Sequence, residues 1–284
     1  MREYEKKYGN RTYKMQDFES MSEIANYLED VDNLKSYSLA KSTLLSQNPE
    51  FYGTRTFEGL LDRLKFGDQQ ITTMYLDKLK QLKSEGEQLT TIKMDIEGFA
   101  YDMGAVVSGE PECCLNSGYP ETKPHLNIYI DVGYCGGVSP ETIANRGVAI
   151  LQLISNLISQ GYLLDIWIVH YITASDDNYY CQRVKLSTEF LTISQLAFAG
   201  KCEFFRVVAW LLTAIQMKYV GYTGSGCSQP SDSVIKELKA DGLYIPSGYT
   251  DSRFNNCSLN KAIDIVTKIY NDYVNERVKC GIRG

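Results

Sequence analysis

The sequence contains little of what most protein metal centres require. Only two histidines, His125 and His170, occur among its 284 residues. It has eight cysteines, but no two of them are spaced as Cys-x-x-Cys, and the only close pair is Cys113-Cys114. Zinc ligands usually come in closely spaced Cys and His pairs, so a zinc cluster of the common kind is excluded. We expect no metal site, no cofactor, and cysteines that serve in packing.

The sequence also lacks an excess of positive charge and any long apolar run. Its formal net charge is −6 and its pI is about 5.1. Because binding to nucleic-acid phosphates depends on clustered Lys and Arg, nucleic acid is not an expected partner. The most apolar stretches, residues 148–172 and 193–215, are interrupted by polar and charged side chains. Neither offers about 20 continuous apolar residues, so we expect buried core elements and no membrane contact.

The nucleotide-binding signatures Gly-x-Gly-x-x-Gly and Walker A are missing as well. Gly133, Gly136 and Gly137 form a glycine loop whose backbone N–H groups could cradle a phosphate, and residues 221–226 form another. No lysine follows either loop in the Walker position. A plain turn is the ordinary interpretation of both segments.

A continuous strand–helix–strand unit is present instead. Residues 126–132 alternate like a strand, residues 139–160 form an apolar helix that stops at Gly161, and residues 162–172 form a second, almost wholly apolar strand. Residues 180–186 alternate as a hairpin partner of that strand. Parallel strands joined by a helix cross over right-handed and bury their sheet on both faces. The sequence therefore predicts an α/β fold: a three-layer core with a mostly parallel sheet and extra helices at both ends.

Composition divides the chain into four segments. Residues 1–17 are polar and charged and predict a flexible arm. Residues 18–90 form a helical N-terminal region, whose first helix has Ser20 as N-cap and Glu23 three residues later, the capping-box pattern. The α/β core covers residues 91–220, and residues 98–107 within it are expected to be helical. Residues 221–284 form a C-terminal loop followed by two helices.

Asp131 marks the candidate ligand-binding site. It ends the first core strand, just before the glycine loop and the N-terminus of the next helix. In open α/β sheets, ligands bind where strand carboxyl ends and helix N-termini meet. The candidate site therefore consists of Asp131, Gly133, Gly136, Gly137 and Arg146, the last in the first turns of that helix. Asp131 would act as the metal ligand or base, and Arg146 with the glycines would hold an anion.

This corner resembles that of a von Willebrand factor A-like, Rossmann-like core. The metal site of that family begins with Asp-x-Ser-x-Ser, whereas the run here is Asp131-Val-Gly-Tyr-Cys135. Both serine positions are lost, and Gly and Cys side chains offer no oxygen to a hard cation. The resemblance therefore implies a degenerate, metal-free form of the core.

A cysteine nucleophile would need His170 as its base, with Cys135 or Cys181 as the thiol. His170 lies inside an apolar strand, where a packed and hydrogen-bonded histidine is the ordinary interpretation. No catalytic residue is therefore predicted.

Three short signatures, taken in order, resemble a bacteriophage protein family catalogued as a domain of unknown function. They lie at residues 18–24, 109–113 and 138–147, and the last, with its Arg-Gly pair, is the most specific. The resemblance covers about residues 18–215. It implies a phage or prophage origin and carries over no activity, substrate or catalytic residue.

Two functions are consistent with these observations. The favoured one is a non-enzymatic phage protein that acts through protein–protein contacts, in virion or replication assembly or on a host factor. It would be made in the host cytoplasm, with the virion as a second destination, and would bind a phage or host protein or further copies of itself. The 21 tyrosines suit such contact surfaces. The alternative is a nucleotide- or phosphate-handling enzyme that uses Asp131.

Overall fold

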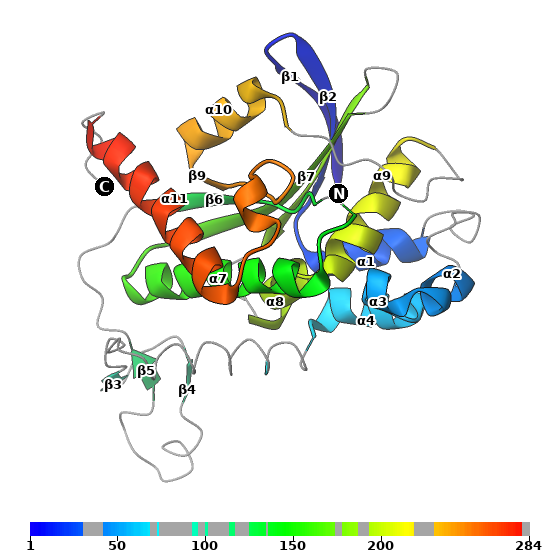
Figure 1. Cartoon of the computed structure of the whole chain (residues 1–284), viewed down its shortest axis with the longest axis horizontal. Helices are drawn as coiled ribbons and strands as arrows, with labels where there is room; N and C mark the ends of the chain where they lie inside the picture. Colours follow the sequence, from blue (N-terminus) through cyan, green and yellow to red (C-terminus); the bar gives the residue numbers. More distant parts are fainter. Residues whose placement is uncertain are drawn as a thin grey trace.

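A six-stranded mixed sheet forms the centre of the computed structural model (Figure 1). The strand order is β1-β2-β8-β7-β6-β9. Its strands are β1 (Arg2–Tyr8), β2 (Arg11–Phe18), β8 (Tyr179–Leu186), β7 (Leu164–Thr173), β6 (Leu126–Asp131) and β9 (Leu243–Ile245). A second, small sheet has the order β3-β5-β4, with β3 (Lys93–Asp95), β5 (Cys114–Asn116) and β4 (Ala100–Tyr101). The structure describes residues 1–30, 42–68, 73, 93–95, 100–101, 114–116, 125–134, 136–173, 178–186, 193–218 and 230–279.

The middle of the main sheet is the predicted strand–helix–strand unit. β6 and β7 run parallel, with Ile128 opposite Ile166, and α7 (Pro140–Ser159) connects them. Ser139 caps α7, because its Oγ accepts a hydrogen bond of 3.2 Å from the N–H of Thr142. β8 then returns antiparallel to β7. The mixed α/β class, these strands and the hairpin are confirmed.

The N-terminus forms a hairpin that extends this sheet, so the prediction of a flexible arm over residues 1–17 was wrong. β1 pairs antiparallel with β2, and β2 pairs parallel with β8. Gly9 makes the turn between β1 and β2 at a φ of 60°, which glycine adopts readily. Tyr13 and Met15 alternate with polar residues and are each only 1% exposed. One face of this charged segment is therefore buried.

Helices from both ends of the chain pack around the sheet. The predicted N-cap of α1 (Met21–Asp30) is present, because the N–H of Glu23 donates to Ser20 Oγ at 3.1 Å. The side chain of Glu23 accepts from the N–H of Glu19 at 2.7 Å, one residue before the cap, so the second half of the capping box is shifted by one residue. The other helices are α2 (Ser42–Gln47), α3 (Pro49–Tyr52), α4 (Phe57–Phe66), α8 (Ile193–Ala199), the π-helix η3 (Phe204–Ala209), α9 (Trp210–Gln216), α10 (Asp232–Asp241), the short η4 (Ser252–Phe254) and α11 (Leu259–Lys279).

The two faces of the main sheet have different covers. The first face carries Ile128, Ile166 and Ile168 and packs in one large apolar core with α1, α7, α8 and α9. The second face carries Tyr129, Val169 and their neighbours and packs against α10. Figure 1 shows α10 on the opposite side of the sheet from α7, α8 and α1, and α11 beside α7.

Two sequence expectations concern the segment before β6. Residues 98–107 were expected to be helical, but Ala100–Tyr101 form strand β4, because they pair with β5. The rest of residues 98–107 lies outside the described residues, as do the loop at residues 221–226 and Cys135. Among the helices that are described, none is both long enough and apolar enough to cross a bilayer.

Candidate functional site

Asp131 lies at the carboxyl end of β6 and is only 2% exposed. Its carboxylate accepts four hydrogen bonds. Oδ1 accepts one from the N–H of Gly133 at 3.0 Å. Oδ2 accepts three from hydroxyl groups that follow or belong to β9: Tyr244 at 3.0 Å, Ser247 at 3.1 Å and Thr250 at 3.0 Å. The carboxylate therefore fastens the segment after β9 onto the end of β6.

Burial and these hydrogen bonds shift the pKa of Asp131 in opposite directions. Burial disfavours the charged carboxylate and raises its pKa above the usual value. The hydrogen bond from Gly133, the charge of Arg146 and the hydroxyl donors each lower the pKa and recover part of that shift. A carboxylate already surrounded by four donors has little capacity left for a ligand.

Arg146 belongs to the same buried cluster and is also 2% exposed. Its Nη2 donates to three main-chain carbonyl oxygens, those of Asp131 at 2.8 Å, Ile245 at 3.2 Å and Pro246 at 2.8 Å. The guanidinium also lies 5.7 Å from the ring centroid of Tyr134 and 5.2 Å from that of Phe254. Arg146 thus joins α7, β6 and β9 and points into the protein.

The glycine loop divides between two clusters. Gly133 lies beside Asp131, and its carbonyl accepts a hydrogen bond from the N–H of Tyr249 at 3.2 Å. Gly136 and Gly137 lie in an exposed turn, where an added Cβ would meet nothing within 4 Å. The carbonyl of Gly136 accepts a hydrogen bond from Arg206 at 3.2 Å. The structure therefore brings Asp131, Gly133 and Arg146 together, and links Gly136 to Arg206.

Arg206 lies in the π-helix η3, a type of segment that is frequent at functional sites. Its side chain is 2% exposed and donates to main-chain oxygens of Val138 at 2.6 Å and Phe51 at 2.8 Å. The guanidinium also lies 4.2 Å from the centroid of the Phe51 ring. Arg206 therefore holds the start of α7 against α3, which is a structural role.

His170 and Cys181 point to opposite faces of the sheet. His170 pairs with Gln182 across β7 and β8, whereas Cys181 pairs with Tyr171, so their side chains alternate in direction. Burial lowers the pKa of His170 to about 4 and raises that of Cys181 to about 12. At neutral pH the histidine is therefore uncharged and the cysteine a thiol. The proposed pairing of Cys181 with His170 is not formed, and Cys135 lies outside the described residues.

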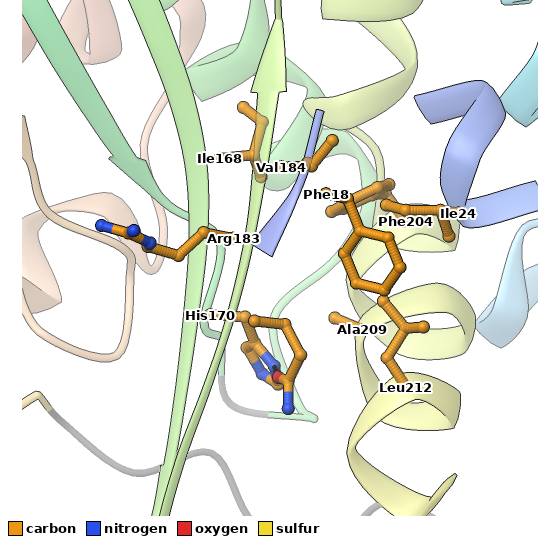
Figure 2. A pocket seen from close by; sticks show the side chains of 10 residues that line it. Phe18, Ile24, Ile168, His170, Arg183, Val184, Phe204, Ala209 and Leu212 are labelled. Atoms are coloured by element: carbon orange, nitrogen blue, oxygen red, sulfur yellow. Dashed lines mark hydrogen bonds between the residues drawn. The ribbon is translucent and has the colours of Figure 1, made fainter. Parts of the chain in front are cut away.

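His170 is part of a buried hydrogen-bond chain on the first face of the sheet. Its Nδ1 lies 3.1 Å from Gln182 Oε1, which also accepts a hydrogen bond of 3.1 Å from Thr213. Gln182 Nε2 in turn donates to Gln216 at 2.7 Å. Figure 2 shows His170 beside a small cavity, with Arg183 pointing away to the other face. The cavity, about 10 Å³, has room for about one water.

A second cluster, on the other face of the sheet, is partly accessible. We define the Trp167 patch as Tyr4, Asp17, Asp165, Trp167, Arg183 and Lys185. Residues 165, 167, 183 and 185 alternate on neighbouring strands and therefore share one face. The Trp167 ring lies 4.9 Å from the guanidinium of Arg183 and 5.8 Å from the ammonium of Lys185. Trp167, Arg183 and Lys185 are half-buried.

Polar contacts hold the Trp167 patch in place. Arg183 donates to Asp17 Oδ1 at 2.8 Å and to Oδ2 at 2.5 Å, and also to the Tyr4 hydroxyl at 2.7 Å. Lys185 forms an ion pair of 2.9 Å with Asp165. Burial alone would lower the pKa of Arg183, but the hydrogen bonds to Asp17 and the negative charges that surround the guanidinium together outweigh burial and raise the pKa. The guanidinium therefore stays charged and fixed beside the indole ring.

Sequence reasoning singled out Asp131 and Arg146, which the structure brings together in a buried cluster, but it did not single out Trp167. The signal that was available is alternation: Trp167 lies two residues from Asp165 on one strand, and Arg183 lies two residues from Lys185 on the next. Within the described residues, His, Cys, Asp and Glu side chains form no group of three that could hold a metal ion.

Comparison with known proteins adds a family and no activity. The family model described as Domain of unknown function (DUF7192) matches residues 5–273. No curated protein and no solved structure matches the chain.

Proposed function

The chain belongs to the DUF7192 family of domains of unknown function, and from its own residues we propose that it is a non-enzymatic binding protein. It acts through protein–protein contacts in a bacteriophage or prophage, in virion or replication assembly or on a host factor. We place it in the host cytoplasm, with the virion as its second destination. Its core is a degenerate von Willebrand factor A-like unit of three layers, in which α10 forms the third layer.

The Trp167 patch is the observation that carries this proposal. Partner-binding surfaces are enriched in Trp, Tyr and Arg, and the energetically dominant residues are packed and desolvated when the partner is bound. Trp167, Tyr4 and Arg183 combine these residue types on one sheet face. Because Arg183 is fixed by Asp17, the patch loses little side-chain freedom when a partner binds.

The charges of the patch favour a protein partner over a nucleic acid. The cations Arg183 and Lys185 are each paired with a carboxylate, Asp17 and Asp165 respectively. The patch therefore presents no net positive charge to a phosphate backbone. A protein surface with polar groups around an apolar recess would complement the indole ring and its charged rim.

The alternative, a phosphate-handling enzyme, has less support. A base or metal ligand at Asp131 needs an accessible oxygen, but both oxygens of this buried carboxylate already accept hydrogen bonds. An anion-holding Arg146 needs a guanidinium directed outward, but its Nη2 donates to three internal carbonyls. Both side chains serve the fold.

Substitution of Trp167 tests the proposal. The tagged wild-type chain, Trp167→Ala and Phe66→Ala would each be purified from the cells that naturally express the protein and analysed by native mass spectrometry. Phe66 is an exposed aromatic residue at the end of α4, 71% accessible, and serves as the matched control. We expect a stoichiometric protein partner with the wild type and Phe66→Ala, and its loss with Trp167→Ala.

Two results would contradict the proposal. Equal recovery of the partner with Trp167→Ala would place the contact elsewhere. A co-purifying nucleotide or divalent ion that disappears in a folded Asp131→Asn variant would favour the enzyme.

A further inference from the structure

β9 lies at one edge of the main sheet, and a cleft runs along it. In the part of the chain that the structure describes, β9 pairs with β6 on one side and is the last strand on the other. The cleft has a volume of about 310 Å³, and Leu243 and Tyr244 of β9 form part of its lining. Its walls come from α10 and α11, which lie on either side of β9 (Figure 1).

An edge strand offers hydrogen bonds that a neighbouring strand can use. On its outer side, alternate residues direct both their N–H and C=O groups away from the sheet. An extended peptide can pair with these groups and become a new strand, a common mode of peptide recognition. The three residues of β9 span about 10 Å at about 3.3 Å per residue, enough for a short segment to pair.

The side chains of the cleft define the chemistry of such a segment. Ile235 of α10 and Ile269 of α11 provide apolar contacts on the two walls. Asp272 and Glu276 of α11 also line the cleft, and both are exposed. They are four residues apart on one helix, where like charges repel each other. A cation placed between them would relieve that repulsion.

The other charges of the cleft leave this acidic wall dominant. Arg253 is paired with Asp251, with contacts from 2.5 to 3.0 Å. Lys239, on α10, is the remaining cation of the lining, so its three carboxylates outnumber its two cations.

We propose that this cleft binds an extended segment of a partner protein, which joins the sheet beside β9 and places a Lys or Arg side chain against Asp272 and Glu276. The segment alternates apolar and basic residues, because successive side chains of a strand point to opposite sides. A slender segment suits the cleft better than a second copy of the chain. In every copy β9 lies between α10 and α11, so two copies would bring their helices into contact before their β9 strands could pair.

A random library of 12-residue peptides tests this inference. Peptides selected on the wild-type chain would be counter-selected on Asp272→Lys/Glu276→Lys, and the retained sequences synthesised. We expect them to contain Lys or Arg within an alternating pattern.

Loss of two surface charge pairs should weaken binding of these peptides about 5-fold or more in the double variant. A peptide with Glu in place of its Lys should show the reverse preference. Asp264→Lys, on the same helix but outside the lining, is the matched control and should bind like the wild type.

Two measurements test the backbone pairing with β9. Bound peptide should slow amide hydrogen exchange at residues 243–245. N-methylation of the peptide amides that face β9 should abolish binding, whereas N-methylation of the alternate amides, which face away, should not. Several results would overturn the inference: a selection that yields no binder, binders indifferent to the charge reversal, or protection confined to another region. Self-association that Asp272→Lys/Glu276→Lys abolishes would overturn it in favour of a second copy.

This site is separate from the Trp167 patch and goes beyond the proposed function. Trp167→Ala should leave peptide binding at β9 unchanged. Loss of the partner in that variant and loss of peptide binding in the α11 variant are therefore independent results.

Discussion

The two faces of the main sheet are built from different side chains and carry different covers. Ile, Leu, Val and Phe dominate the first face and meet α1, α7, α8 and α9. The second face contains five buried tyrosines, at positions 8, 13, 129, 171 and 244, and meets α10. Aliphatic groups gain stability from burial alone, whereas tyrosine combines a large apolar ring with a hydroxyl that tolerates water. The larger aliphatic core therefore lies on the first face, whereas the second face combines a smaller, tyrosine-rich core with the half-buried Trp167 patch.

The tyrosines also explain how the second face stays packed although α10 is the helix that covers it, whereas α1, α7, α8 and α9 cover the first face. Tyr13 packs edge-on against Tyr8 and Tyr171, with ring centroids 5.4 and 5.8 Å apart. Its hydroxyl lies 3.5 Å from that of Ser231, just before α10. Lys6 of β1 forms an ion pair of 2.6 Å with Glu237 of α10. Ring contacts and polar links therefore supply part of the contact area that further helices supply on the first face.

The largest expected effect comes from Asp131, where the second face meets the segment after β9. Asp131→Ala leaves the hydroxyls of Tyr244, Ser247 and Thr250 without their common acceptor and removes a charge beside Arg146. We expect a loss of about 4 kcal/mol in the free energy of unfolding, the scale for breaking a buried charged cluster. Urea denaturation measures it.

Asp251→Ala is the control for this substitution. It breaks an ion pair with Arg253, which is 47% exposed, and removes the N-cap of η4, and it should cost about 1 kcal/mol. Similar losses for the two variants would show that Asp131 does not anchor this corner.

A neighbouring pair on β7 separates the two faces directly. Ile168 points to the first face and is 2% exposed, whereas Trp167 points to the second and is half-buried. Ile168→Ala should cost about 3.5 kcal/mol of stability, because it opens a cavity in the core. Trp167→Ala should cost less than half of that, although it removes the larger side chain. Thermal denaturation at equal concentration compares them, and a greater loss for Trp167→Ala would reverse the assignment of roles.

Acid should weaken the first face through His170. Its pKa is about 4 in the folded chain, because burial penalises the charged ring, against about 6.5 when unfolded. Between these values the unfolded chain holds a proton that the folded chain does not. Stability therefore falls as the pH drops from 6.5 to 4, by about 3 kcal/mol from this residue.

His170→Gln is the comparison for that experiment, since its amide can still contact Gln182 but does not titrate. Denaturant midpoints measured from pH 7 to pH 4.5 should fall more steeply for the wild type than for the variant. Parallel curves would assign the acid sensitivity to other groups.

Regular periodicity explains which parts of the fold could be predicted from the sequence. The strand at residues 126–131, the helix that begins after Ser139 and the hairpin of β7 and β8 each show a long, consistent pattern. The hairpin of β1 and β2 was missed because Arg, Lys and Glu fill alternate positions and obscure the buried tyrosines. β9 was missed because three residues are too few to show a period.

In the candidate site, too, features set by neighbouring residues could be predicted from the sequence, whereas contacts between distant segments could not. The position of Asp131 follows from its place at the end of a strand, but its acceptor role depends on hydroxyls 113 to 119 residues further along the chain. The Trp167 patch likewise joins Asp17 to Arg183 across 166 residues. Contacts at such separations arise from the strand order, which local patterns do not specify.

The pairing of β2 with β8 also has a consequence for synthesis of the protein on the ribosome. Lys14 lies opposite Tyr180, so β2 emerges long before its neighbour. At about 5–20 residues per second, roughly 10–30 s separate the two strands. During that interval Tyr13 and Met15 of the nascent hairpin lack their native cover, and the inner edge of β2 is open to pairing with other nascent chains. The hairpin of β1 and β2 is therefore a segment of the nascent chain that a chaperone would have to protect until β8 is synthesised.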